Sequence, residues 1–206
     1  MSALPTGQLD AREQLLATAS RLMRENDTID VSLSELSKAS GLNSALVKYY
    51  FGNKGGLMRE LLARDMLGVS EGLGKLTGTE LDLEARFRMH IGDVVDTLYR
   101  KPYLVRLMIQ LLHESTPSES KRLADDYLRP IYDTYDQLIG EGIEAGIFRP
   151  VDPTMFFFTL VGSADRFFAA RVFLQYCFGE DSLTEELRDR YRAHAVDFIM
   201  AGLLKT

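Results

Sequence analysis

The 206-residue sequence predicts an all-α protein of about nine helices, with a small N-terminal domain and a larger C-terminal helical bundle. Apolar residues recur at helical spacing along most of the chain, and no stretch sustains the alternation that is typical of a strand. Proline is absent between Pro5 and Pro102, so no proline interrupts a helix in that half. A hydrophobic content of 46% argues against a disordered chain.

Two short helices joined by a tight turn are predicted near the N-terminus. Ser32 and Glu35 have the spacing of a capping box, which satisfies two backbone donors at a helix start. Gly41 supplies the left-handed residue that ends this helix, and Asn43 or Ser44 caps the next one. A helix pair of this kind can place its second helix in the major groove of DNA.

The charge of this segment is one-sided. Between Leu36 and Met58 the sequence contains Lys38, Lys48 and Lys54 and no acidic residue. Since neutralised phosphates supply much of the affinity for DNA, an acid-free surface at a helix–turn–helix favours DNA binding. The alternative is a solvated helix pair in an ordinary helical protein.

This segment resembles the tetracycline-repressor (TetR) family of bacterial transcription regulators over roughly residues 10–60. That family has a Thr- or Ser-capped helix, a small residue and a glycine before the turn, then an aromatic pair and a lysine. Here those positions are Ser32, Ala39, Gly41, Tyr50, Phe51 and Lys54.

The resemblance implies a homodimeric, ligand-responsive regulator, usually a repressor, which binds a palindromic operator and is released by a small-molecule effector. It also implies that the helix from Ser44 to Phe51 reads the DNA. Base edges would meet Ser44, Ala45 and Lys48, phosphates or the groove wall would meet Ser34, Tyr49 and Lys54, and Asn43 would lie nearby.

Two departures from the family pattern stand out. The family often has a tyrosine where this chain has Lys48, so a charged donor to guanine O6 and N7 becomes available. The family usually has an acidic residue after its lysine, whereas Gly55 and Gly56 follow here. We expect each glycine to loosen the first turn of that helix by about 1 kcal/mol.

Charge divides the chain into an expected DNA-binding domain, residues 1–58, and a ligand-binding and dimerisation domain, residues 59–206. The first part holds six basic and six acidic residues, so the net charge of −6 comes from the second. An acidic body repels DNA, which confines binding to one small face. Between the two, a long helix is expected to end near Leu67, where Gly68, Gly72 and Gly74 follow.

The segment from Met155 to Phe178 is apolar around most of its circumference, which predicts a helix buried on two sides. One side would pack on its own domain. The other, with a last helix capped by Ser182, would form a four-helix interface with a second copy; a core helix in a monomer is the alternative. The interface candidates are Phe168, Arg171, Leu187, Tyr191 and Phe198.

A small-molecule pocket is expected among the middle helices, where aromatic and methionine side chains accompany a few polar ones. An ordinary helical core has the same composition. Arg166 lies in an apolar segment and needs an anionic partner, for which we favour a structural bond. The ligand-binding candidates are Tyr103, Met108, His113, Phe158 and Arg166.

No catalytic or metal-binding residue is predicted, and no cofactor. The three histidines lack metal-ligand spacing, and neither a nucleophile elbow nor a phosphate-binding glycine loop is present. The N-terminal residues show no apolar targeting segment, and the longest apolar run is too short to span a bilayer. Cys177, the single cysteine, has apolar neighbours and predicts a core thiol in a reducing cytoplasm.

Two other classes of function remain open from the sequence alone. A helical enzyme would need clustered catalytic groups, which no motif supplies. A helical protein–protein adaptor, or a small-molecule-binding protein with a helix–turn–helix that does not bind DNA, would show no steep salt dependence with DNA.

Overall fold

The computed structural model describes residues 10–78 and 80–205, and confirms the all-α class within them. These residues form eleven α-helices and one π-helical segment, and the one β feature among them is an isolated bridge between Phe148 and Leu204. In chain order the helices are α1 (Ala11–Glu25), α2 (Leu33–Ser40), α3 (Ala45–Phe51), α4 (Lys54–Gly78), α5 (Leu83–Arg100), α6 (Leu104–Glu114), α7 (Pro117–Leu123), the π-helical η1 (Ala124–Leu128), α8 (Arg129–Glu144), α9 (Pro153–Ala169), α10 (Arg171–Phe178) and α11 (Glu185–Leu203). The N-terminal residues 1–9, where no targeting segment was predicted, lie outside the described part.

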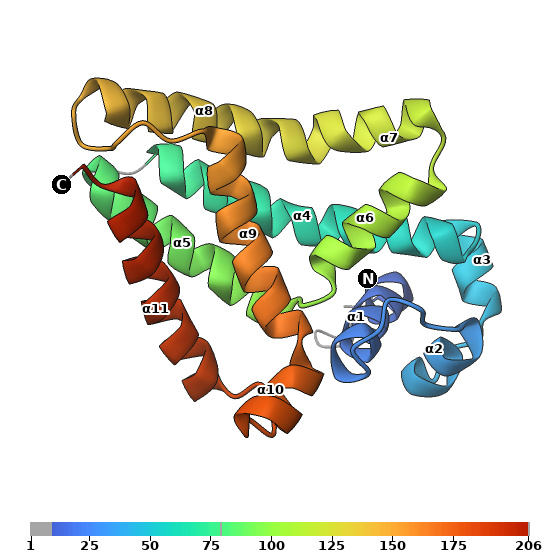
Figure 1. The fold of residues 1–206 in the computed structure, drawn as a ribbon. Coiled ribbons are helices and arrows are strands. Elements are labelled where there is room, and N and C mark those ends of the chain that lie inside the picture. The colour runs from blue at the N-terminus through green and yellow to red at the C-terminus, as the bar shows by residue number, and fades with distance from the viewer. Residues whose placement is uncertain (1–9, 79, 206) are drawn as a thin grey trace, which may run out of the picture.

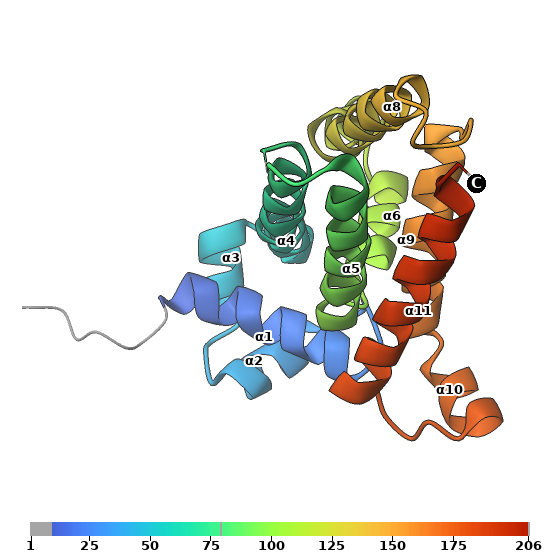
Figure 2. The same ribbon diagram turned by 90° about the vertical axis from the view of Figure 1, so that its left-hand side faces the viewer.

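Helices α1–α3 gather at one end of the molecule, and α4 runs from them into the bundle (Figure 1). Helix α5 is central and packs against α4, α9 and α11. Helices α7 and α8 form a long rod along one edge, while α9, α10 and α11 form one outer face (Figures 1 and 2). The small N-terminal module is therefore attached to the bundle mainly through α4, which contacts both α1 and α5.

The long helix does not end near Leu67, as the glycines suggested, but continues to Gly78. A Cβ added at Gly68, Gly72 or Gly74 would meet no atom within 4 Å, so no close approach requires these glycines. Glycine weakens a helix, but the burial of Leu73 and Leu76 on the other face holds the last turns in place.

Two helical segments are each interrupted in the structure. The segment 155–178, expected as one helix, breaks after Ala169 and gives α9 and α10. The helix that begins at Pro117 is capped by the Thr116 side chain and widens into η1 just before Pro130. Proline cannot donate a backbone hydrogen bond, and π-helical turns accommodate such defects.

Two predictions in the C-terminal part are wrong. Thr184, not Ser182, caps α11, because its side chain accepts a hydrogen bond from the backbone N–H of Leu187. Cys177 is exposed on α10 and is not a core thiol. Its apolar neighbours in the sequence are exposed as well, so they form a surface where a buried helix was expected.

An aromatic cluster lies at the centre of the bundle between α5, α8 and α9. The ring of Phe87 meets those of Phe148 and Phe156 edge to face, and Tyr135 meets Phe156 in the same way. The Nε2 of His90 lies 2.6 Å from the hydroxyl of Tyr135. Burial lowers the pKa of His90 to about 4, so its imidazole is neutral at pH 7.

The joint between α3 and α4 is tight. Gly52 ends α3 with a φ of 77°, and Asn53 Oδ1 accepts a hydrogen bond of 2.8 Å from the backbone N–H of Gly56. A Cβ at Gly56 would overlap the carbonyl oxygen of Phe51. A glycine is therefore needed at position 56 because no side chain fits there, a requirement that its low helix propensity did not predict.

We predict that Gly56→Ala lowers the free energy of unfolding by about 2 kcal/mol or more, because a backbone carbonyl cannot move aside as a side chain can. Gly68→Ala is the matched control: it lies in the same helix beside open space and should stabilise the protein by about 0.5–1 kcal/mol. Urea unfolding followed by circular dichroism measures both. Equal stability of the two variants would contradict the assigned role of Gly56.

We also predict that His90 makes the folded state sensitive to acid. Its pKa is about 4 in the folded protein and 6.5 for an ordinary, solvated histidine, so the unfolded chain binds the proton more readily. The contribution of the neutral His90 to the free energy of unfolding is fully present above pH 6.5. About 2–3 kcal/mol of it is lost as the pH falls toward 4. Unfolding titrations at pH 7 and pH 4.5 measure how much the free energy of unfolding depends on pH. His90→Gln should remove most of this pH dependence. His113→Gln, at an exposed histidine, is the control and should retain it. An unchanged pH dependence in His90→Gln would contradict the prediction.

Candidate nucleic-acid interface

The predicted capping box at the start of α2 is present. Ser32 Oγ accepts a hydrogen bond of 3.1 Å from the backbone N–H of Glu35, and Glu35 Oε2 accepts one of 2.9 Å from the backbone N–H of Ser32. The side-chain and backbone hydrogen bonds from Ser32 lower the pKa of Glu35. Gly41 ends the helix in the left-handed region at φ 70°, as predicted.

The turn between α2 and α3 is held by side chains of α1, of α2 and of the turn itself. Ser40 Oγ accepts a hydrogen bond of 3.2 Å from the backbone N–H of Leu42, and Gln14 of α1 donates one of 2.9 Å to the Ser40 carbonyl. Asn43 Oδ1 accepts a hydrogen bond of 2.8 Å from the backbone N–H of Ala45. Since Ser44 makes no capping bond, its hydroxyl is available to another partner.

Helix α3 presents a polar outer face over an apolar inner one. Val47 is buried, whereas Tyr49 is 78% exposed and Lys48 is exposed beside it. Six of the seven predicted DNA contacts share this exposure: Ser34, Asn43, Ser44, Ala45, Lys48 and Tyr49.

Lys54, the seventh predicted contact, is half-buried and already has a partner. Its Nζ lies 2.6 Å from Asp30 Oδ1, and this hydrogen bond and charge lower the pKa of Asp30. Asp30 precedes α2 and lies outside the acid-free segment of the sequence. Lys54 would have to share or leave this exposed pair in order to reach a phosphate, and such pairs are weak.

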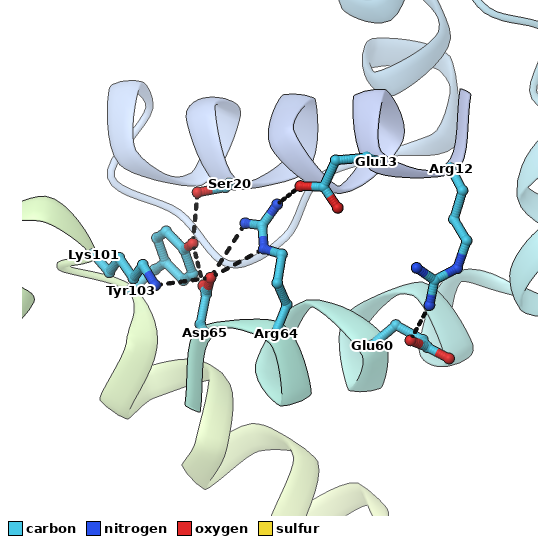
Figure 3. A network of polar contacts seen from close by, with 8 residues as sticks. All are labelled: Arg12, Glu13, Ser20, Glu60, Arg64, Asp65, Lys101 and Tyr103. Carbon is cyan, nitrogen blue, oxygen red and sulfur yellow. Dashed lines mark hydrogen bonds and ion pairs between the residues drawn. The ribbon is translucent and has the colours of Figure 1, made fainter. Parts of the chain in front are cut away.

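A buried carboxylate connects the helix–turn–helix module to the bundle. Asp65 of α4 is 1% exposed, and its oxygens lie 3.0 Å from Lys101 Nζ and 3.2 Å from Arg64 Nη2. The hydroxyl of Tyr103 donates a hydrogen bond of 2.6 Å to the same carboxylate. Figure 3 shows these side chains meeting between α1, α4 and the turn that joins α5 to α6.

The network extends to α1 in two places. Burial, and then the charge of Asp65, raise the pKa of Tyr103, so its hydroxyl stays protonated and donates to Asp65. Ser20 Oγ, 2.6 Å away, is therefore the donor to the Tyr103 oxygen. Arg64 Nη1 also lies 2.8 Å from Glu13 of α1, and the charges of Asp65 and Glu13 raise the pKa of Arg64 although burial opposes them.

A second connection runs from α6 to the loop between α1 and α2. Arg106 donates a hydrogen bond of 2.6 Å to Asp27 Oδ1 and one of 3.3 Å to the Asp27 carbonyl. Asp27 has a φ of 48°, which is uncommon for a residue other than glycine. The guanidinium therefore fixes a strained loop residue from the bundle side.

The structure does not bring the five predicted ligand-binding residues together. Tyr103 is part of the Asp65 network, Met108 is buried on α6, and His113, Phe158 and Arg166 are exposed. Because Arg166 is exposed, it needs no structural bond, contrary to our expectation. Among the described residues, one groove of about 450 Å³ lies between α4 and α5, and another of about 260 Å³ lies between the N-terminal module and α6. Neither is lined by any of the five.

The predicted interface residues occupy three environments. Phe168 and Leu187 are buried within their own chain. Tyr191 and Arg171 are half-buried, the former stacked on Phe167 at 3.9 Å between ring centroids, and Phe198 is largely exposed. Met155 and Phe158 on α9 are exposed as well, although neither was an interface candidate.

Sequence reasoning missed the residues that join the two parts of the molecule. Asp65 and Arg64 look like solvated charges in an amphipathic helix, and their partners lie far along the chain. A signal was present for Asp65, because it lies on the apolar side of α4 with Leu61 and Leu62 nearby. Arg106 and Asp27 carry no comparable signal.

Over residues 10–78 and 80–205, no group of three or more His, Cys, Asp and Glu side chains is placed to hold a metal ion. No helix in the same ranges combines the length and the apolar character needed to cross a membrane.

Several transcription regulators of known structure share this fold. KstR2, a ketosteroid transcriptional regulator of Mycobacterium tuberculosis, has a TM-score of 0.69 at 16% identity, covering 97% of this chain and 98% of its own. A putative transcriptional regulator from Saccharomonospora viridis in complex with choline has a TM-score of 0.67 at 20% identity, covering 97% and 100%. FadR from Bacillus subtilis in complex with stearoyl-CoA has a TM-score of 0.65 at 16% identity, covering 92% and 98%. At these identities the likeness shows the fold alone.

No curated protein is detectably similar to the chain in sequence. Two family models match it: the tetR family of bacterial regulatory proteins over residues 15–61, and the tetracyclin repressor-like C-terminal domain over residues 80–206. Together with the helix–turn–helix geometry, these matches show that the chain belongs to the TetR family of transcription regulators.

Proposed function

We propose that the protein is a homodimeric transcriptional repressor that binds a palindromic operator and releases it when a small-molecule effector binds. The observation that carries the proposal is the exposed face of α3 and of the turn before it, which carries no acidic residue. Lys48 and Tyr49 project from a helix whose opposite side is anchored by the buried Val47. A short helix held in this way can enter a major groove as a rigid unit.

Charge supports a small and specific DNA-binding face. The chain carries a net charge of −6, so most of its surface repels a phosphate backbone. Lys48 would donate to a base edge or a phosphate, and Tyr49 would lie against the groove wall. Ser44 and Asn43 lie at the start of α3, where backbone N–H groups also favour a phosphate.

Exposed apolar side chains support dimerisation through α9 and α11. Met155 and Phe158 on α9 and Phe198 on α11 are each more than half exposed, and these two helices lie on the outer face of the bundle (Figure 2). Exposed apolar patches of this kind mark interaction sites. A two-fold dimer would present two copies of α3 to successive major grooves, about 34 Å apart.

The buried Asp65 network and the Arg106–Asp27 pair support coupling between effector and DNA. Both join the N-terminal module to the α5–α6 region of the bundle. An effector that binds one arrangement of the bundle more tightly would shift the population of dimers away from the DNA-binding arrangement. Regulators of this fold have been solved with choline and with stearoyl-CoA. A cytoplasmic, non-enzymatic role completes the proposal, and the free Cys177 fits a reducing compartment.

We predict that Lys48→Ala and Tyr49→Ala each weaken binding to the DNA upstream of the protein's own gene about tenfold, or roughly 1.4 kcal/mol, at moderate salt. Lys48→Ala should also make the salt dependence of binding shallower by about one unit if Lys48 contacts a phosphate. Fluorescence anisotropy with labelled duplexes measures both quantities.

Lys75→Ala is the control, because it removes an exposed lysine from the far end of α4. It should bind like the parent protein. If both α3 variants also bind like the parent, the groove assignment is wrong. If the parent binds no duplex from its own promoter, a helical adaptor becomes the better description.

A further inference from the structure

Helix α10 is nearly unsupported by its own chain. Leu174 is its single buried residue, whereas Val172, Phe173, Tyr176 and Phe178 are between 60% and 78% exposed. An isolated helix of eight residues is marginal in water, because helix nucleation is costly and few hydrogen bonds repay it. Its apolar side chains therefore need a partner surface.

The position of α10 places it next to the proposed dimer interface. It joins α9 to α11 and lies at the end of the outer face that these two helices form (Figures 1 and 2). The helices that form this face, α9 and α11, already expose Met155, Phe158 and Phe198. The exposed apolar side chains of α10 thus continue the proposed dimer interface toward the end of the molecule that holds α1.

The surface area that a stable dimer must bury also favours a second copy of this chain as the partner of α10. A stable protein interface buries about 800 Å² on each partner. Large apolar side chains at this exposure offer roughly 100–150 Å² each, so three of them on α9 and α11 fall short. Val172, Phe173 and Tyr176 share one side of α10, add roughly 300–450 Å² and bring the face to about the required size.

The charges around α10 are complementary to those of a second copy. Arg171 begins the helix, and its Nε is buried without a hydrogen-bond partner. Asp181 follows its end and is exposed. Neither has an ion-pair partner within residues 10–78 and 80–205. When two copies of α10 pair antiparallel about a two-fold axis, Arg171 of each lies at the end where Asp181 of the other is.

We propose that α10 is an intersubunit arm that packs antiparallel against α10 of a second copy of this chain, with Arg171 facing Asp181 of the partner subunit. The inference rests on the proposed homodimer and extends it beyond α9 and α11. Aromatic side chains form the centre of this contact and the arginine lies at its rim, which is the usual composition of a tight interface.

Sedimentation velocity over a concentration series tests the apolar part of the contact. The double variant Phe173→Ala/Tyr176→Ala keeps helix propensity, since alanine is the best helix former. It should raise the dimer dissociation constant at least tenfold with unchanged helical content by circular dichroism. Leu67→Ala, at an exposed leucine of α4, is the matched control and should dimerise like the parent.

A charge exchange tests the antiparallel arrangement. Arg171→Glu and Asp181→Arg should each weaken the homodimer several-fold, because each places like charges opposite one another. An equimolar mixture of the two variants restores both opposite-charge contacts, so native mass spectrometry should show the mixed dimer in excess over either homodimer. A statistical mixture would overturn the antiparallel contact.

The outcomes separate this inference from the proposed dimer. If the parent is dimeric, and Phe158→Ala/Phe198→Ala dissociates it while the α10 double variant does not, the arm is wrong and the α9–α11 interface stands. If the parent stays monomeric at all concentrations, both the arm and the homodimer are wrong.

Discussion

The buried carboxylate of Asp65 is the interaction on which the arrangement of this molecule depends. It is almost fully removed from solvent, and it is stable there because Lys101, Arg64 and the Tyr103 hydroxyl surround it. A buried charge without such partners would be strongly destabilising. Helix α4 and the α5–α6 turn must therefore keep their positions relative to one another. Ser20 and Glu13 of α1 bind Tyr103 and Arg64 of the same network, so the position of α1 is fixed as well (Figure 3).

This constraint explains how a small module can be controlled by a bundle. The helix–turn–helix has its own local supports, yet α1, which braces it, is bonded to residues of the bundle. Arg106 adds a second connection through the strained loop residue Asp27. A displacement of α6 would therefore act on α1 at Ser20 and on the loop after α1 at Asp27.

Local features of the N-terminal module could be predicted from the sequence, because they depend on neighbouring residues. The capping box of Ser32 and Glu35 and the left-handed Gly41 follow from short spacings, and the structure confirms both. The length of α4 could not be predicted, because the burial of its last turns outweighs the effect of its glycines. The Asp30–Lys54 pair, the Asp65 network and the exposure of Cys177 depend on residues far apart in the sequence or on an outer face that composition does not reveal.

Native-state hydrogen exchange on the parent and on Asp65→Asn tests most directly whether this carboxylate makes α1 and the bundle one cooperative unit. The account predicts that amides of α1 and of the α5–α6 junction open with the same free energy in the parent. In Asp65→Asn, α1 should open at a lower free energy while the core of α5 keeps its protection. Independent opening of α1 already in the parent, or an unchanged α1 in the variant, would contradict the account.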